Sequence, residues 1–234
     1  MSTSVRIGFL LFPDMLQLDF TGPYAVLAAG PDVEIRTIWK DTQPVRSSDG
    51  LSFFPNSLLT DCPALDVLCV PGGGGVQALL NDVEVLAFLA AQAKTCRYLC
   101  SICTGALILG AAGLLEGYKA TTHWQSLDIL PLFGAEPQSR RVVMDGNRIS
   151  AAGVSAGIDM ALTLAGLLWG RATAQGIQLG MEYAPEPPYA AGSPASAPPD
   201  VVEAALSRTE TRQAARRKAA TEAAERLRAA SRGN

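Results

Sequence analysis

One cysteine lies where two predicted elements meet, and it is the strongest candidate for chemistry in this sequence. Cys103 follows the apolar run "RYLCSI" and precedes "TGALIL", so it would occupy a turn from a strand into a helix. Such a turn needs small or compact neighbours, which Thr104, Gly105 and Ala106 supply, and it lifts one side chain out of the sheet as a nucleophile elbow. We also expect the start of the helix to lower the pKa of the thiol below its usual value of about 8.5.

Two other interpretations of Cys103 stay open. A free cysteine in an apolar run is often only a small buried residue. Cys100 and Cys103 also form a CxxC pair, but the first cysteine of a redox pair usually opens the helix, whereas Cys100 would lie within the strand. We therefore favour a nucleophile at Cys103 and a structural role for the other cysteines.

A nucleophilic thiol needs a partner that accepts and donates a proton. His123, the sole histidine, either lines the site or is a structural imidazole. Asp19 is the better candidate, because it follows the first predicted strand and the loops after parallel strands gather at one sheet edge. Its apolar neighbours should raise its carboxyl pKa towards neutrality. The alternative role for Asp19 is a plain helix N-cap.

A glycine run, "PGGGGVQAL" (71–79), directly follows a predicted strand and opens a helix. Glycines at such a place let backbone N–H groups approach a ligand and form an anion or oxyanion cradle, with Gly73 as one donor. A mere tight turn is the competing interpretation. The run has neither the GK[ST] of a Walker loop nor the spacing GxGxxG, so it does not indicate a nucleotide site.

These candidates belong to a chain in which strand and helix patterns alternate. Near-continuous apolar runs predict strands at 5–12, 33–40, 65–72 and 97–103. Apolar spacing near 3.6 predicts helices over 18–30, 75–95 and 104–117. A long apolar helix is expected over 155–170, and residues 171–183 follow it and close the main fold. The alternation predicts an α/β fold whose mainly parallel central sheet is flanked by helices. Two segments, 45–59 and 140–153, interrupt it and are expected to form small hairpin excursions.

The expected organisation is one catalytic domain followed by an extension. Residues 1–183 form the catalytic domain, and residues 184–200 are too rich in proline for a helix or inner strand, so they form an ordered wrap or a linker. Residues 201–234 form a C-terminal helix. We favour a solvated or dimer-packing role for this helix over a basic arm for nucleic acid, because its charges are interspersed.

Composition excludes several classes of protein. The 234 residues are 48% hydrophobic and 18% charged, with a net charge of −3, as in an ordinary globular protein without nucleic-acid partners. There is no signal-peptide core and no apolar run of membrane-spanning length, so we expect no membrane association and a cytoplasmic location. Five cysteines and one histidine suit neither a disulfide framework nor a metal site.

Taken in order, Asp19, the glycine run, "SICTGALILGAAGLL" and "ATTHW" resemble the ThiJ/PfpI superfamily of class I glutamine amidotransferase-like proteins. The likeness covers about residues 4–183 and implies a flavodoxin-like sandwich. Most members have a glutamate near the cysteine, and protease-like members have a histidine after it. In this sequence the acid is Asp19 instead of a glutamate, and the residue after Cys103 is Thr104 instead of a histidine. These departures speak against proteolysis.

Within the superfamily the sequence resembles the isocyanide hydratase branch, on "FLLFP…QLDFTGP", "CTGALILGAAGLL", "ATTHW" and "YAPEPPYAAGSP". That resemblance implies a homodimer without a cofactor. It also implies that Cys103 is the nucleophile, that Asp19 is the general acid/base, and that Thr104 and Val154, with Gly153 beside it, line the substrate site.

The implied chemistry suits these residues. A Cys103 thiolate adds to the isocyanide carbon while Asp19 supplies a proton, and water then releases an N-substituted formamide from the thioimidate. Two alternatives use the same cysteine: a glyoxalase or deglycase-like hydrolase acting on 2-oxoaldehydes, and a redox-sensing or chaperone-like protein. A transcription regulator would need a helix-turn-helix module, and the roughly 35 residues after Pro199 offer one helix.

Overall fold

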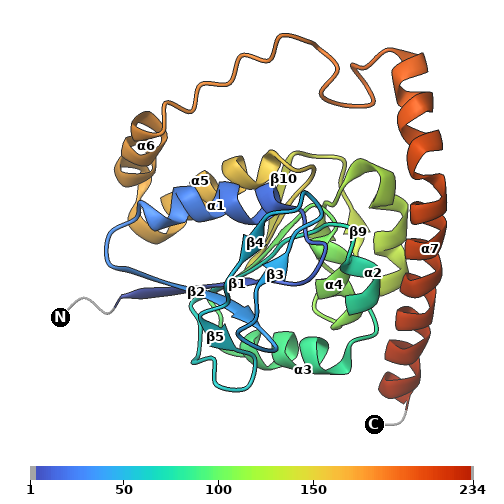
Figure 1. The fold of residues 1–234 in the computed structure, drawn as a ribbon, viewed down its shortest axis with the longest axis horizontal. Helices are drawn as coiled ribbons and strands as arrows, with labels where there is room; N and C mark the ends of the chain where they lie inside the picture. The colour runs from blue at the N-terminus through green and yellow to red at the C-terminus, as the bar shows by residue number, and fades with distance from the viewer. Residues whose placement is uncertain (1–3, 233–234) are drawn as a thin grey trace.

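A seven-stranded sheet forms the centre of the computed structural model, which describes residues 4–232 (Figure 1). Its strands are β1 (Val5–Leu10), β2 (Val33–Trp39), β5 (Ser57–Leu58), β6 (Val67–Val70), β7 (Tyr98–Ile102), β10 (Val142–Asp145) and β11 (Arg148–Ala151). The order across the sheet is β10-β11-β7-β6-β1-β2-β5, and the β10–β11 pair is antiparallel while the other pairs are parallel. This order from β2 to β11 is that of a flavodoxin-like fold, which confirms the predicted fold class.

Helices cover both faces of the sheet, and this explains why its central strands are apolar throughout. On one face lie α1 (Gln17–Ala28), α5 (Ala156–Trp169) and α6 (Arg171–Gly180). On the other face lie α2 (Val76–Leu79), α3 (Val83–Gln92), α4 (Gly105–Ala111), the 3₁₀ helix η1 (Trp124–Phe133) and α7 (Pro199–Arg232). Among the residues described, no helix is both long and apolar enough to cross a membrane.

Two sequence predictions about local structure were wrong. The single helix expected over 75–95 is two helices, because Asp82 has an extended backbone and its side chain caps α3 by accepting a hydrogen bond from Val85 N. The hairpin expected at 140–153 exists, but it is no excursion. Its second strand, β11, pairs with β7 and extends the central sheet, since Ile149, Ser150 and Ala151 are buried.

The other predicted hairpin is confirmed in part. Strands β3 (Val45–Arg46) and β4 (Ser52–Phe53) pair antiparallel, whereas β5 from the same segment joins the central sheet beside β2. A further short pair, β8 (Lys119–Ala120) with β9 (Glu136–Pro137), was not expected from the sequence.

The C-terminal helix α7 packs along its own chain. Residues 184–198 form an exposed connection, without helix or strand, that arches from α6 to α7 (Figure 1). The buried face of α7 contains Ala220, Ala223 and Ala224, whose small side chains allow close approach to α2, α4 and η1. One face of the helix is therefore buried in the same chain, a role that was not among those expected for it.

Candidate active site

Three neighbouring strands bring the candidate residues to one edge of the sheet. Asp19 lies in the first turn of α1, after β1, while Gly72 and Gly73 follow β6 and Cys103 follows β7. Because β1, β6 and β7 are adjacent and parallel, their carboxyl ends converge. The predicted convergence of these groups is present.

The backbone at Cys103 has the geometry of an elbow. Its φ of 54° lies in the left-handed region, which residues other than glycine adopt rarely and at a cost. Two hydrogen bonds hold it there: Cys103 N donates to Ala151 O at 3.0 Å, and Thr122 Oγ1 donates to Cys103 O at 2.7 Å. A side chain at Gly105 would place its Cβ 2.1 Å from Val70 O, so the turn requires glycine there.

Asp19 is completely buried, and its burial changes the acidity of the carboxyl. Its Oδ2 accepts a hydrogen bond from Gly72 N at 2.9 Å, while its Oδ1 has no such bond. Burial raises the pKa of this carboxyl from 3.8 to about 7, against smaller opposing effects of the Gly72 N–H and of the neighbouring Cys103 thiol. The predicted rise in pKa is confirmed. The N-cap alternative is not, since the N-cap of α1 is Leu16.

The Cys103 thiol differs from the sequence expectation. Its side chain is 6% exposed, and burial, followed by the charge of Asp19, raises its pKa well above the usual range. Hydrogen bonds from the N–H and hydroxyl of Thr104 act in the opposite direction but are outweighed. The expectation of a lowered thiol pKa was therefore wrong, because removal of water outweighs the helix start. Near neutral pH the thiol is therefore protonated, while the Asp19 carboxyl is close to its own pKa.

The glycine loop approaches Asp19 and Thr104 closely. A Cβ on Gly72 would lie 2.6 Å from Thr104 N and 2.9 Å from Asp19 Oδ2, so no larger residue fits between them. Gly73 has a φ of 139°, and its N–H donates to Thr104 Oγ1 at 3.1 Å. The loop thus ties Asp19 to Thr104, and the N–H of Gly73 is already engaged.

A cavity of about 260 Å³ opens above the cysteine. It is lined by Leu16, Ser48, Gly73, Gly74, Cys103, Thr104, His123, Gln125, Val154, Arg212 and Arg216. Of the predicted site residues, Asp19 is not among the lining groups because it is completely buried. Gly153 lines a second cavity, which shares His123 and Val154 with the first.

His123 is held in its neutral form. Burial, with smaller contributions from Arg216 and Arg212, lowers the pKa of its imidazole to about 4. Its Nδ1 accepts a hydrogen bond from Gln125 N at 3.4 Å. The imidazole therefore borders the cavity as an uncharged polar wall.

The cysteine pair is not arranged for redox chemistry. Cys100 is fully buried in β7 and stands opposite Cys69 of β6, whose thiol hydrogen-bonds with it. Among the described residues, no three His, Cys, Asp or Glu side chains gather as a metal site would require.

Sequence reasoning missed the two arginines of the cavity, Arg212 and Arg216. A signal for Arg216 was present, because it shares the helical spacing of Ala220, Ala223 and Ala224 on the stripe that α7 buries. An arginine among small apolar residues on a buried helix face indicates that its guanidinium has a specific partner in the domain against which the helix packs.

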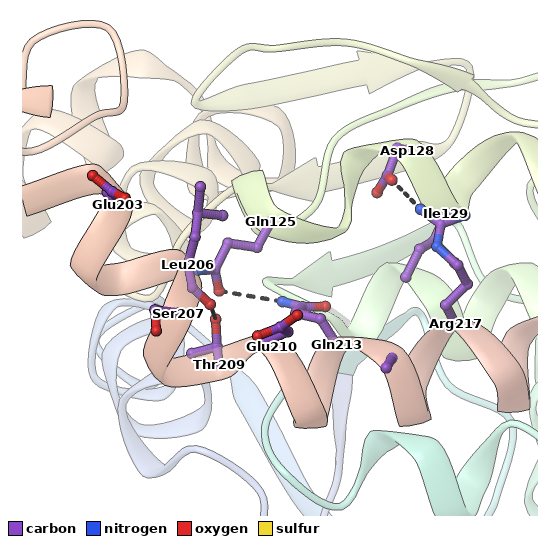
Figure 2. A pocket seen from close by; sticks show the side chains of 11 residues that line it. Gln125, Asp128, Ile129, Glu203, Leu206, Ser207, Thr209, Glu210, Gln213 and Arg217 are labelled. Atoms are coloured by element: carbon purple, nitrogen blue, oxygen red, sulfur yellow. Dashed lines mark hydrogen bonds and ion pairs between the residues drawn. The ribbon is translucent and has the colours of Figure 1, made fainter. Parts of the chain in front are cut away.

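A larger cavity lies beside the site, between η1 and α7 (Figure 2). Across it Gln213 Nε2 donates to Gln125 Oε1 at 3.2 Å, and Arg217 pairs with Asp128. It contains none of the predicted site residues, so we do not assign it to the chemistry.

Comparison with known proteins places this fold and site in a class. Residues 5–166 match the DJ-1/PfpI family, and the chain belongs to that family. A crystal structure of a ThiJ/PfpI family protein from Pseudomonas syringae is 40% identical, with a TM-score of 0.90 and coverage of 94% of this chain and 90% of that chain.

Two named proteins are similar to this chain in sequence. The chain is 55% identical over 205 residues to "Isonitrile hydratase" of Pseudomonas putida, which covers 88% of this chain and 90% of the relative. It is 34% identical over 173 residues to the HTH-type transcriptional regulator GbdR of Pseudomonas aeruginosa. That match covers 70% of this chain but only 47% of the regulator.

Proposed function

We propose that this protein adds water to an isocyanide, R–NC, and releases an N-substituted formamide, R–NH–CHO. The observation that carries the proposal is the buried carboxyl of Asp19, with a pKa raised to about 7, beside the Cys103 thiol that lines a small cavity. The 55% identity to an isonitrile hydratase supports the substrate class.

The first step joins the substrate to the cysteine. The Cys103 thiol gives its proton to the Asp19 carboxylate, the sulfur attacks the isocyanide carbon, and Asp19 passes the proton to that carbon. The product is the thioimidate R–N=CH–S–Cys103, which contains every atom of the thiol and the isocyanide. The raised thiol pKa makes the transfer to Asp19 unfavourable by itself, so the proton must move on to carbon as the C–S bond forms.

The second step consumes water. Asp19, ionised again, removes a proton from a water molecule that attacks the thioimidate carbon, and it passes that proton to the nitrogen. The tetrahedral adduct R–NH–CH(OH)–S–Cys103 collapses to the formamide and the thiol. The substrate has then gained one water molecule, and the enzyme returns to its starting protonation.

Backbone and side-chain donors assist both steps in this proposal. The N–H of Thr104 faces the sulfur and stabilises it as both the attacking and the leaving group. The N–H of Gly73 joins in by exchanging its bond to Thr104 Oγ1 for one to substrate. Val154, with Gly153 beside it, forms the wall that contacts the substituent R.

We also propose that the protein acts as a homodimer and needs no cofactor. Support for an assembly comes from large apolar side chains left in water at α6 and the following connection, with Leu179 82% and Tyr189 80% exposed.

The test is turnover of the purified protein with an aryl isocyanide, followed by the appearance of the formamide. We expect the wild-type protein to produce the formamide and the Cys103→Ala variant to lose this activity. Methylglyoxal is the matched comparison, because a glyoxalase with the same thiol would consume it. Consumption of methylglyoxal without any formamide would overturn the proposal.

A further inference from the structure

A guanidinium is buried beside the cysteine without an acidic partner. Arg216 is 4% exposed and forms three hydrogen bonds of 3.3 Å, from Nη1 to Ser126 Oγ and Gln213 Oε1, and from Nη2 to Gly73 O. All three acceptors are uncharged, and Nε has no hydrogen bond. Within residues 4–230 no carboxylate forms an ion pair with it. A buried charge without a counter-charge is costly, which indicates a missing anion.

The position of Arg216 identifies where that anion belongs. Arg216 lines the same cavity as Cys103, and Arg212 lies one helical turn earlier on the same face of α7, where it is exposed. The cavity wall therefore contains two guanidinium groups, that of Arg216, which is buried, and that of Arg212, which is in contact with water.

No charged acid in the cavity wall balances these two charges, because the Cys103 thiol, which interacts with Arg216, has a raised pKa and is protonated near neutral pH. None of the lining side chains is a carboxylate, and His123 is neutral. Two acids are near the cavity without lining it: Asp19, which is buried and transfers the proton in the proposed reaction, and Asp49, which is exposed next to the lining residue Ser48. The charge balance of the site is thus completed by whatever molecule enters it.

We infer that the site selects isocyanides that also have a carboxylate, with the carboxylate paired to Arg216 and Arg212 while the isocyanide carbon lies at Cys103. This inference rests on the proposed function and specifies its substrate class. The planar guanidinium suits a carboxylate because it can donate two parallel hydrogen bonds. The cavity volume of about 260 Å³ restricts the substrate to a small acid.

A matched pair of substrates tests the inference: 4-isocyanobenzoate and 4-isocyanobenzamide, which have similar shape and differ in charge. We expect wild-type protein to hydrate the benzoate with the higher kcat/KM. In Arg216→Gln the kcat/KM for the benzoate should fall about tenfold to hundredfold, as loss of a charge-assisted hydrogen bond implies. The value for the benzamide should change far less, and Arg216→Lys should restore part of the preference.

Two further variants separate charge recognition from folding. Arg217→Gln is the matched control, because Arg217 is the next residue of α7 but pairs with Asp128 outside the cavity, and it should keep the wild-type preference. Arg212→Gln removes an exposed charge, so it should fold even where Arg216→Gln does not. It should lower the benzoate value several-fold with little change for the benzamide.

The possible outcomes distinguish the two proposals. Equal losses for both substrates in Arg216→Gln would show that the arginine serves the Cys103–Asp19 pair, and would overturn substrate recognition. A wild-type protein without preference for the benzoate would also overturn it, while leaving isocyanide hydration intact. If wild-type protein hydrates neither compound, the proposed function falls and this inference falls with it.

Discussion

Replacing Asp19 by asparagine should change the free energy of unfolding in a pH-dependent way. Relative to wild type, the variant should be more stable at pH 8 than it is at pH 4. In the wild type the carboxyl is completely buried, and its pKa is raised from 3.8 to about 7 because its charged form is removed from water. Folding therefore favours the protonated carboxyl. The stability that Asp19 contributes is fully present below about pH 4 and is lost as pH rises through about 7.

The size of this effect follows from the two pKa values. Each pKa unit corresponds to about 1.4 kcal/mol, so ionising Asp19 in the folded state costs about 4 kcal/mol. Asparagine does not titrate. The difference in free energy of unfolding, variant minus wild type, should therefore grow by about 4 kcal/mol between pH 4 and pH 8. Any constant effect of the amide on packing cancels from this change.

Urea unfolding at several pH values measures the difference directly. Glu186→Gln is the control, because Glu186 is exposed in the connection before α7 and its charge remains in water. We expect the control to show a nearly constant difference from wild type over this pH range. An Asp19→Asn difference that is also constant, or that shrinks towards pH 8, would refute the account of a carboxyl ionised against its burial.

Three other predictions concern the site and the assembly. Gly72→Ala should keep the fold but lose most hydration activity, because the added Cβ would collide with Thr104 and Asp19. Circular dichroism measures the fold and kcat measures the activity, and an unchanged kcat would contradict the close approach. Thr104→Val should lower kcat about tenfold through the lost hydroxyl, with recovery in Thr104→Ser; equal rates in all three proteins would remove that hydroxyl from the mechanism. Light scattering should give the mass of a dimer, and a monomer mass at micromolar concentration would contradict the proposed homodimer.

The order of elements was predictable because it depends on local pattern. Near-continuous apolar runs identified the strands, and the compact residues after Cys103 identified a tight turn into a helix. The raised pKa of Asp19 was also predictable, since its flanking residues Leu18 and Phe20 are apolar in the sequence itself.

What the sequence could not predict depends on contacts between distant segments. The thiol pKa of Cys103 was predicted in the wrong direction, because its burial is a property of the assembled site and not of the helix start. Arg216 reaches the cavity only because α7 packs back on the domain, more than a hundred residues after the cysteine. The interruption at Asp82 depends on one side-chain cap that competes with continuous helical spacing.

The central claim is that the isocyanide carbon becomes bonded to Cys103. Rapid acid quench of the protein mixed with excess 4-isocyanobenzamide, followed by peptide mass spectrometry, tests it most directly. We predict a transient peptide that contains Cys103, increased by the mass of one substrate molecule, which forms before the formamide and decays with it. Formamide production at the wild-type rate without that adduct, or by the Cys103→Ala variant, would contradict the account.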